Sequence, residues 1–304
     1  SRTEAWEFTF REMGEVLGVA PATVLRYLRR NKWRYVAKKL RPALEPKHLE
    51  ARKAWCEENR RNTFEAWIDI DEKWFYTVST GTKLKVPPGT RPPRKSIKHK
   101  KHITKVMCLV AVARPCAQHR FGGIVGVWRV GDMEVAKRSS KNRAAGTPEF
   151  KDKTMDGDRY ADMMIKKVIP AARSRMPWCD TIVIQADNAP GHASQSSNNR
   201  IKRYLGKSNK PNVPNVRLNF QPAQSPDLNV LDLAVFPSLS KRVGKVQKSA
   251  GVYDKEQLWK NVHTQVFSYS SDLLTRAFDT KQKVIKQVLA CEGGNDYELP
   301  HSKK

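Results

Sequence analysis

Two short apolar stretches, each with an aspartate in it or at its end, limit this chain to few folds. Residues 64–79 have the aromatic and β-branched content of a strand and contain Asp71. Residues 179–187 are mostly apolar and end at Asp187, as a buried strand would, and residues 103–113 are a second continuous apolar run. Sheets of α/β proteins place ligand sites just beyond the carboxyl ends of their strands. We therefore predict an α/β fold with a functional site near Asp187.

A third acidic position lies in the stretch QPAQSPDLNVLD, residues 221–232. The residues alone leave a choice here, because a short side chain such as Asp227 commonly caps a helix or stabilises a turn. Asp232 follows about one turn into the expected helix. The first strand leaves a similar choice, since alternation places Asp69, Asp71 and Lys73 on one face.

Isolated carboxylates in a basic chain favour a cation site. Mg²⁺ prefers hard oxygen ligands and often takes one or two carboxylates plus substrate phosphates. A pair of metal ions about 4 Å apart can stabilise both the attacking and the leaving oxygen in phosphodiester chemistry. The pattern predicts metal-dependent DNA strand chemistry with two Mg²⁺ or Mn²⁺ ions.

The charge balance indicates a nucleic-acid partner. The chain has 57 Lys and Arg against 30 Asp and Glu, a net charge of +27 in 304 residues. Its five cysteines lack the spacing of a zinc site or a disulfide framework and read as the reduced thiols of an intracellular protein. No apolar run approaches the roughly 20 residues of a membrane span, so we expect no membrane partner.

Residues 1–32 have the layout of a helix-turn-helix module, with apolar Phe10, Met13, Val16 and Leu17 on one helical face and a turn at Gly18. A second helix from about Pro21 to Arg30 would enter the major groove. The side chains predicted to face DNA are Thr23, Arg26 and Arg30. The alternative is an ordinary helical hairpin with a solvated basic face.

Two further segments are candidates for contact with the DNA backbone. Residues 33–62 read as a basic linker, and the candidate contacts in it are Arg34, Lys38 and Lys39. Its segment from Glu45 to Arg61 reads as a helix with Leu49, Ala54 and Trp55 inward. Residues 73–131 contain many Lys and Arg and no Asp or Glu. This charge pattern suits salt-sensitive binding of DNA phosphates. The candidate contacts in this segment are Arg91, Arg94, Lys95, Lys98, Lys100 and Lys101. The linker could instead be a solvated tether, and residues 73–131 could be a disordered run of charges.

The motifs DEKWF, QADNA followed by His192, and SPDLNVLDL resemble the three acidic blocks of the mariner-like transposases. HITKVMCLVAVARP, AKRSSKNRAAG and GGNDYELPH are similar to the plant-type branch. The resemblance implies a ribonuclease-H-like catalytic domain at residues 63–304, a mixed sheet flanked by helices with further helices at the carboxyl end. It also implies that Asp71, Asp187 and Asp232 form the catalytic and metal-binding triad, and it favours Asp71 over Asp69 and Asp232 over Asp227. Asp69 is then expected to accept hydrogen bonds from neighbouring backbone or from a lysine.

The same resemblance implies supporting roles for Asn188 and His192. The histidine would position substrate or a carboxylate; general acid–base work and a purely structural histidine bonded to a carbonyl are the alternatives. Expected partners are transposon terminal repeats and target DNA cut at a TA dinucleotide, bound by a homodimer in the nucleus. Family members usually carry two helix-turn-helix modules, of which this sequence shows only the second. Two alternatives stay open, a catalytically silent DNA-binding protein and a metal nuclease without strand transfer.

Further expectations concern the elements around the site. Residues 159–170 read as a helix with Tyr160, Met163, Met164 and Val168 inward, and residues 136–153 as an exposed basic loop. Pro237 falls inside the expected helix of Asp232, where a proline costs roughly 3 kcal/mol, so either this helix ends early or this copy of the protein has decayed. Apolar stripes between residues 253 and 291 predict helices packed on the sheet edge, with a stop at Gly293.

Overall fold

The computed structural model describes residues 9–33, 41–77, 88–89, 91, 103–139, 143–188, 194–208, 210–250 and 254–300. It divides the chain into two compact units, Ser1–Arg41 and Pro42–Lys304. Nine of the predicted site residues lie outside the described residues: Arg34, Lys38, Lys39, Arg94, Lys95, Lys98, Lys100, Lys101 and His192.

The first unit is a helical hairpin of α1 (Phe10–Leu17) and α2 (Pro21–Arg30), as expected from the sequence. A capping box between Thr9 and Glu12 begins α1, and Gly18 ends it in the left-handed conformation. The turn packs closely against α1 at Gly14, the one buried residue of that helix, where an added Cβ would lie 2.6 Å from the carbonyl oxygen of Val19. This contact point differs from the predicted apolar face, because Val16 and Leu17 of that face are exposed.

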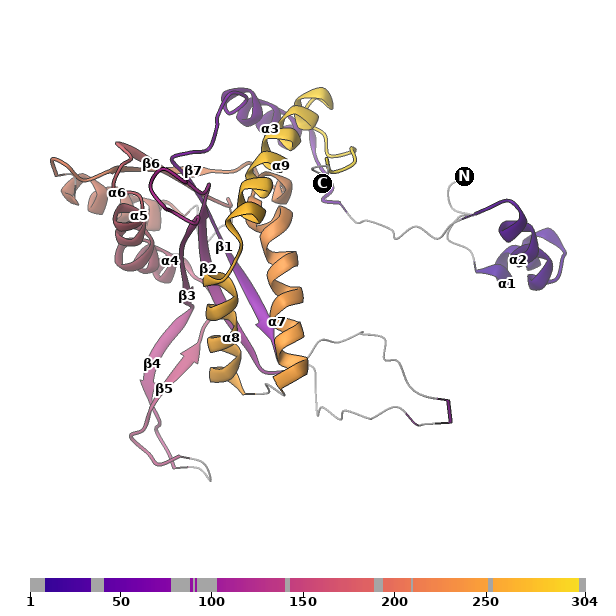
Figure 1. Cartoon of the computed structure of the whole chain (residues 1–304), viewed down its shortest axis with the longest axis horizontal. Helices are drawn as coiled ribbons and strands as arrows, with labels where there is room; N and C mark the ends of the chain where they lie inside the picture. Colours follow the sequence, from indigo (N-terminus) through magenta and orange to yellow (C-terminus); the bar gives the residue numbers. More distant parts are fainter. Residues whose placement is uncertain are drawn as a thin grey trace. The chain divides into compact units, whose positions relative to one another are not determined.

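A five-stranded mixed sheet forms the centre of the second unit (Figure 1). Its strand order is β3-β2-β1-β6-β7, and the bounds are Trp67–Tyr76 for β1, Lys105–Ala113 for β2, Ile124–Arg129 for β3, Thr181–Ala186 for β6 and Asn215–Phe220 for β7. β2 pairs antiparallel with β1 and β3, whereas β1, β6 and β7 run parallel to one another. The carboxyl ends of β1 and β6 therefore point toward the same edge of the sheet.

The segment predicted as an exposed loop contains a strand. β5 (Pro148–Asp152) pairs antiparallel with β4 (Gly131–Val135) in a two-stranded hairpin that extends from the edge of the main sheet (Figure 1). Opposite charges stabilise the pair, because Lys151 and Lys153 both form ion pairs with Glu134. The composition of residues 136–153 alone does not reveal such pairs, because their partners lie on another strand.

Helices cover both faces of the sheet (Figure 1). One face packs against α4 (Gly157–Met163), the π-helical turn η3 (Met164–Val168), α5 (Ile169–Arg175) and α6 (Gln195–Ser208). The other face packs against α3 (Pro46–Glu58), α7 (Phe236–Ala250), α8 (Lys255–Phe267) and α9 (Ser271–Ala290). Between β7 and α7 lie the 3-10 turn η4 (Pro226–Leu228) and the π-helical turn η5 (Leu231–Val235). The four predicted inward residues of 159–170 are buried, as are most of the predicted carboxyl-terminal stripe residues.

Helix α3 belongs to the second unit, although the sequence places it in the linker of residues 33–62. Its buried face consists of Arg52, Trp55 and Cys56, and it packs against α9. Ala54, which the sequence predicts to face inward, is exposed. The structural boundary consequently lies between Arg41 and Pro42 and not at residue 62.

Both prolines that interrupt the helical segments are accommodated by π-helical turns. Pro170 follows η3 and Pro237 follows η5, each as the second residue of the next α-helix. A π-turn bonds residues five apart, and the amide of Phe236 accordingly donates to the carbonyl of Leu231. The helical segment thus continues through Pro237, and the prediction that it ends early there is wrong.

None of the described helices is long and apolar enough to cross a membrane.

Candidate active site

Three elements bring the predicted acidic residues to one edge of the sheet. Asp71 lies within β1, Asp187 directly follows β6, and Asp232 is the second residue of η5. β1 and β6 are neighbours in parallel register, with Asp69 opposite Gln185. Two residues further along each chain, the same register brings Asp71 level with Asp187.

The carboxylate of Asp71 lies in surroundings that disfavour its charge. Burial raises the pKa of Asp71 well above its ordinary value, and the nearby charges of Asp232, Glu72 and Asp187 raise it further. The Glu72 amide opposes this by donating a hydrogen bond of 2.7 Å to Asp71 Oδ1. A group of acids that raise one another's pKa is typical of a site that is completed by a cation.

Asp232 belongs to the same electrostatic cluster. Loss of hydration raises the pKa of Asp232 although part of its surface is exposed, while a hydrogen bond with Asp71 and the charge of Lys73 lower it. Asp187 adds a further repulsion. The net pKa shift of Asp232 is upward.

The two rival acids are already engaged by other partners. Asp69 is fully buried and paired with Lys281, as the expectation of a lysine or backbone partner for Asp69 anticipated. Asp227 accepts two hydrogen bonds from Arg52, at 2.8 and 2.7 Å, and another from the Tyr297 hydroxyl. Of the two roles open for Asp227 in the sequence, a helix cap or a turn residue, it does not have the first at η5, because the Leu231 amide donates to Asn229 Oδ1; Asp227 lies within the 3-10 turn η4.

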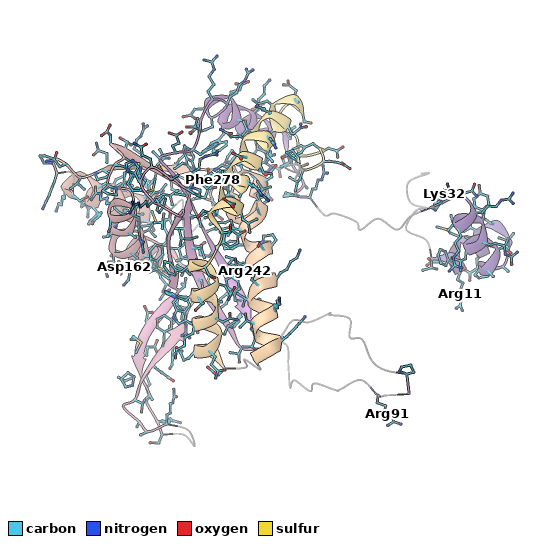
Figure 2. The ribbon with its side chains drawn as sticks, viewed as in Figure 1. Arg11, Lys32, Arg91, Asp162, Arg242 and Phe278 are labelled. Atoms are coloured by element: carbon cyan, nitrogen blue, oxygen red, sulfur yellow. The ribbon has the colours of Figure 1, made fainter. Side chains whose placement is uncertain are left out.

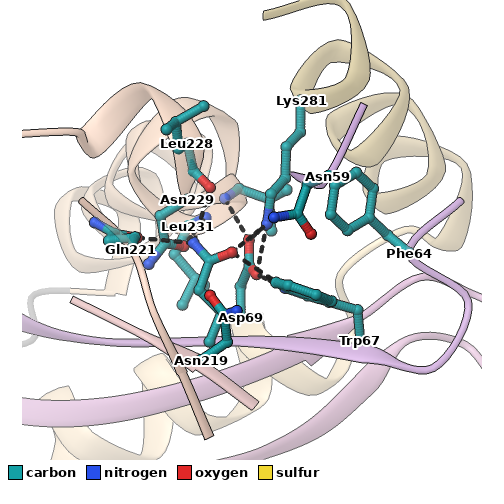
Figure 3. Close-up of polar contacts among 12 residues, drawn as sticks. Asn59, Phe64, Trp67, Asp69, Asn219, Gln221, Leu228, Asn229, Leu231 and Lys281 are labelled. Atoms are coloured by element: carbon teal, nitrogen blue, oxygen red, sulfur yellow. Dashed lines mark hydrogen bonds and ion pairs between the residues drawn. The ribbon is translucent and has the colours of Figure 1, made fainter. Parts of the chain in front are cut away.

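Sequence reasoning missed the buried polar residues that surround Asp69 (Figure 3). Lys281, Gln185 and Asn229 are all buried, and none was singled out as a site residue. One signal was present, since Lys281 lies on the apolar face of α9, at helical spacing from Phe278 and Ile285. A lysine on such a face is rarely fully buried unless it has a charged partner.

The donor set fits a hard divalent cation. Carboxylate oxygens are the ligands that Mg²⁺ and Mn²⁺ favour, and Mg²⁺ retains several waters and needs few protein ligands. Among the described residues no three His, Cys, Asp or Glu side chains already form a metal cage. A cation would nevertheless relieve the crowding of three acids, the partly exposed Asp71 and Asp187 and the exposed Asp232.

The described candidates for DNA contact lie on the surface. Thr23, Arg26 and Arg30 are exposed on α2, whereas Val24 of the same helix is buried. The side chains of Arg11 and Lys32 also project outward from this unit (Figure 2). Arg91 is exposed in the second unit, and Asn188 is exposed directly after Asp187.

The fold is that of the Mos1 mariner transposase, whose catalytic domain is ribonuclease-H-like. The Mos1 paired-end complex with the left transposon end matches at a TM-score of 0.64 and 19% identity, covering 96% of this chain and 76% of that one. The complex with Mn has a TM-score of 0.65 at the same identity. The isolated Mos1 catalytic domain matches over its whole length, with 85% of this chain, at a TM-score of 0.55 and 17% identity. No protein-family model and no curated protein sequence matches this chain.

Proposed function

We propose that this protein is a transposase of the mariner-like type that cuts transposon ends and joins them to target DNA. The observation that carries the proposal is the electrostatic cluster of Asp71, Asp187 and Asp232 at the carboxyl edge of β1 and β6. The overall fold, shared with a protein solved in complex with a transposon end, supports it. The net charge of +27 suits a DNA substrate.

In this proposal Asp71, Asp187 and Asp232 would hold two Mg²⁺ or Mn²⁺ ions. When bound, such ions supply charge stabilisation for the attacking and leaving oxygens of a phosphodiester. The carboxylates fix the position of the scissile phosphate relative to the sheet edge. Because burial and crowding raise the pKa of Asp71, binding of a cation by the cluster would compete with binding of a proton.

Other parts of the chain would hold the DNA. The exposed Thr23, Arg26 and Arg30 of α2 would reach into the major groove, as the second helix of a helix-turn-helix does. Arg91 and the cations around it in sequence would bind phosphates without regard to base identity. A homodimer acting at transposon ends in the nucleus, a TA target and membership of the plant-type branch belong to the same proposal.

The test is nicking and strand transfer on plasmid DNA in the presence of Mn²⁺, comparing the wild type with Asp187→Asn. We expect the wild type to give nicked and joined products, and the variant to lose at least two orders of magnitude in rate while keeping its DNA affinity. Cuts without joined ends would reduce the assignment to a metal nuclease. Equal DNA binding with no cutting by either protein would replace it with a silent DNA-binding protein.

A further inference from the structure

We propose that Lys281 is a positioning residue, whose buried ammonium holds the three acid-bearing segments in one arrangement by joining Asp69 and Gln185. The inference rests on the proposed function, since it concerns the same three carboxylates. It assigns a role to a side chain of α9 that lies behind the sheet edge (Figure 3).

The ammonium of Lys281 has no unused donor. It donates to Asp69 Oδ1 at 2.8 Å, to Asp69 Oδ2 at 2.9 Å and to Gln185 Oε1 at 2.8 Å. An ammonium has three N–H groups, so these three hydrogen bonds satisfy it completely. Both Lys281 and Asp69 side chains are 0% exposed. The ammonium of Lys281 thus links a residue of β1 to a residue of β6.

The two bridged residues also hold the segment that precedes Asp232. Asp69 Oδ2 accepts a 2.8 Å hydrogen bond from the Val230 amide. Gln185 Nε2 donates to the carbonyl of Leu228 at 2.9 Å, and Asn229 Nδ2 donates to the carbonyl of Ile70 at 3.2 Å. The network consequently joins β1, β6 and the η4–η5 connection.

The spacing between network and acids is the same in all three segments. Asp69 precedes Asp71 by two residues, Gln185 precedes Asp187 by two, and the Val230 amide precedes Asp232 by two. In a strand, residues two apart project from the same face. Each contact therefore fixes its segment two residues before the acid. A shift of any one of these segments would move the carboxylate that it bears.

The surroundings keep this network dry and rigid. The Lys281 ammonium lies 4.6 Å from the centre of the Phe64 ring and 5.3 Å from that of Trp67. Trp67 Nε1 donates to Asp69 Oδ1 at 2.9 Å and to Gln185 Oε1 at 3.1 Å. A buried ion pair is weak evidence for stability but can serve to specify one arrangement.

The deciding experiment neutralises the pair without leaving a lone charge. In Asp69→Asn/Lys281→Met both charges are removed and the methionine keeps an unbranched chain, so the fold should survive. Mn²⁺ binding to the full chain is measured by the electron paramagnetic resonance of free Mn²⁺, with circular dichroism and plasmid binding as checks on folding. We expect the Mn²⁺ Kd to rise at least tenfold with DNA affinity unchanged.

The matched control is Arg129→Met/Asp152→Asn, which neutralises another buried ion pair. Neither of its residues is among the charges that act on the pKa of Asp71 or Asp232, so its Mn²⁺ Kd should equal that of the wild type. If the Asp69/Lys281 variant is folded and also binds Mn²⁺ as the wild type does, the inference is overturned.

A second variant decides the matter if the first does not fold. Gln185→Met leaves the Asp69–Lys281 pair intact but releases the carbonyl of Leu228, and it too should weaken Mn²⁺ binding at least tenfold; an unchanged Kd refutes the role. A wild type that binds no Mn²⁺ and cuts no DNA is a different result. It removes the proposed function itself, and with it the inference.

Discussion

The buried Arg52 of α3 makes a contact whose strength can be estimated and tested. Its guanidinium forms a two-point ion pair with Asp227 and also donates to the carbonyl of Gly293 at 2.8 Å. The side chain of Arg52 is 0% exposed and that of Asp227 is 17% exposed. Gly293 can approach α3 this closely only without a side chain, because an added Cβ would lie 2.1 Å from the carbonyl oxygen of Leu49.

Replacing Arg52 with methionine should destabilise the second unit substantially. Removing one partner of a buried ion pair costs about 3–5 kcal/mol. We place this case at about 3 kcal/mol, because Asp227 keeps some water and the Tyr297 hydroxyl. In a unit of this size about 1 kcal/mol lowers Tm by roughly 2–4 °C, so we expect a decrease of about 6–12 °C. The measurement is thermal unfolding followed by circular dichroism and calorimetry.

The neighbouring residue provides a matched control. Lys53 pairs with Glu292 between the same two parts of the chain, but the two side chains are 40% and 75% exposed. Exposed ion pairs contribute little to stability, so Lys53→Met should have the same Tm as the wild type. In Arg52→Met/Asp227→Asn the lone carboxylate is absent, and part of the lost stability should return. Equal Tm values for the Arg52→Met and Lys53→Met variants would refute the reasoning.

Three further outcomes follow from the structure. Because the folded-state pKa of Asp71 is raised, its stabilising contribution is present below its unfolded pKa of about 3.9 and is lost as pH rises through the folded pKa. Asp71→Asn should therefore raise the Tm of metal-free protein at pH 7 but not near pH 4, and reduce the gain in Tm on adding Mn²⁺. Pro237→Ala should change the free energy of unfolding by less than about 1 kcal/mol, against roughly 3 kcal/mol expected for a proline inside an α-helix, as urea titration would measure. Arg26→Ala should weaken binding to the specific DNA site by about 1–3 kcal/mol in DNA-binding titrations, because Arg26 would lose its contact in the major groove.

Local patterns were enough to predict much of the fold. The bounds of α2 agree with the predicted Pro21–Arg30, and the apolar run of residues 103–113 became β2. The strand that ends next to Asp187 and the buried face of Tyr160, Met164 and Val168 were also predictable. In each case the signal is a periodicity or an apolar run within a few consecutive residues.

The parts that could not be predicted depend on partners distant in the chain. Lys281 and Asp69 are 212 positions apart, and Arg52 and Asp227 are 175 apart. A charged residue on a helix reads as solvated until its partner is placed beside it. For the same reason the contact of Asp227 with Arg52 was not predicted, and the strand β5 was missed in a segment whose pairing partner lies outside it.

The two π-turns have a consequence for comparing this chain with its structural neighbours. A π-turn holds one residue more than an α-turn, and one residue corresponds to about 100° of rotation around the helix axis. Asp232 and the core residue Leu239 therefore follow different helical phases within one unbroken segment. Deleting a single residue between Leu231 and Val235 would keep the helix but turn Asp232 to another side. An alignment with a protein that lacks the π-turn should therefore open a one-residue gap there, at the position where the helix changes phase.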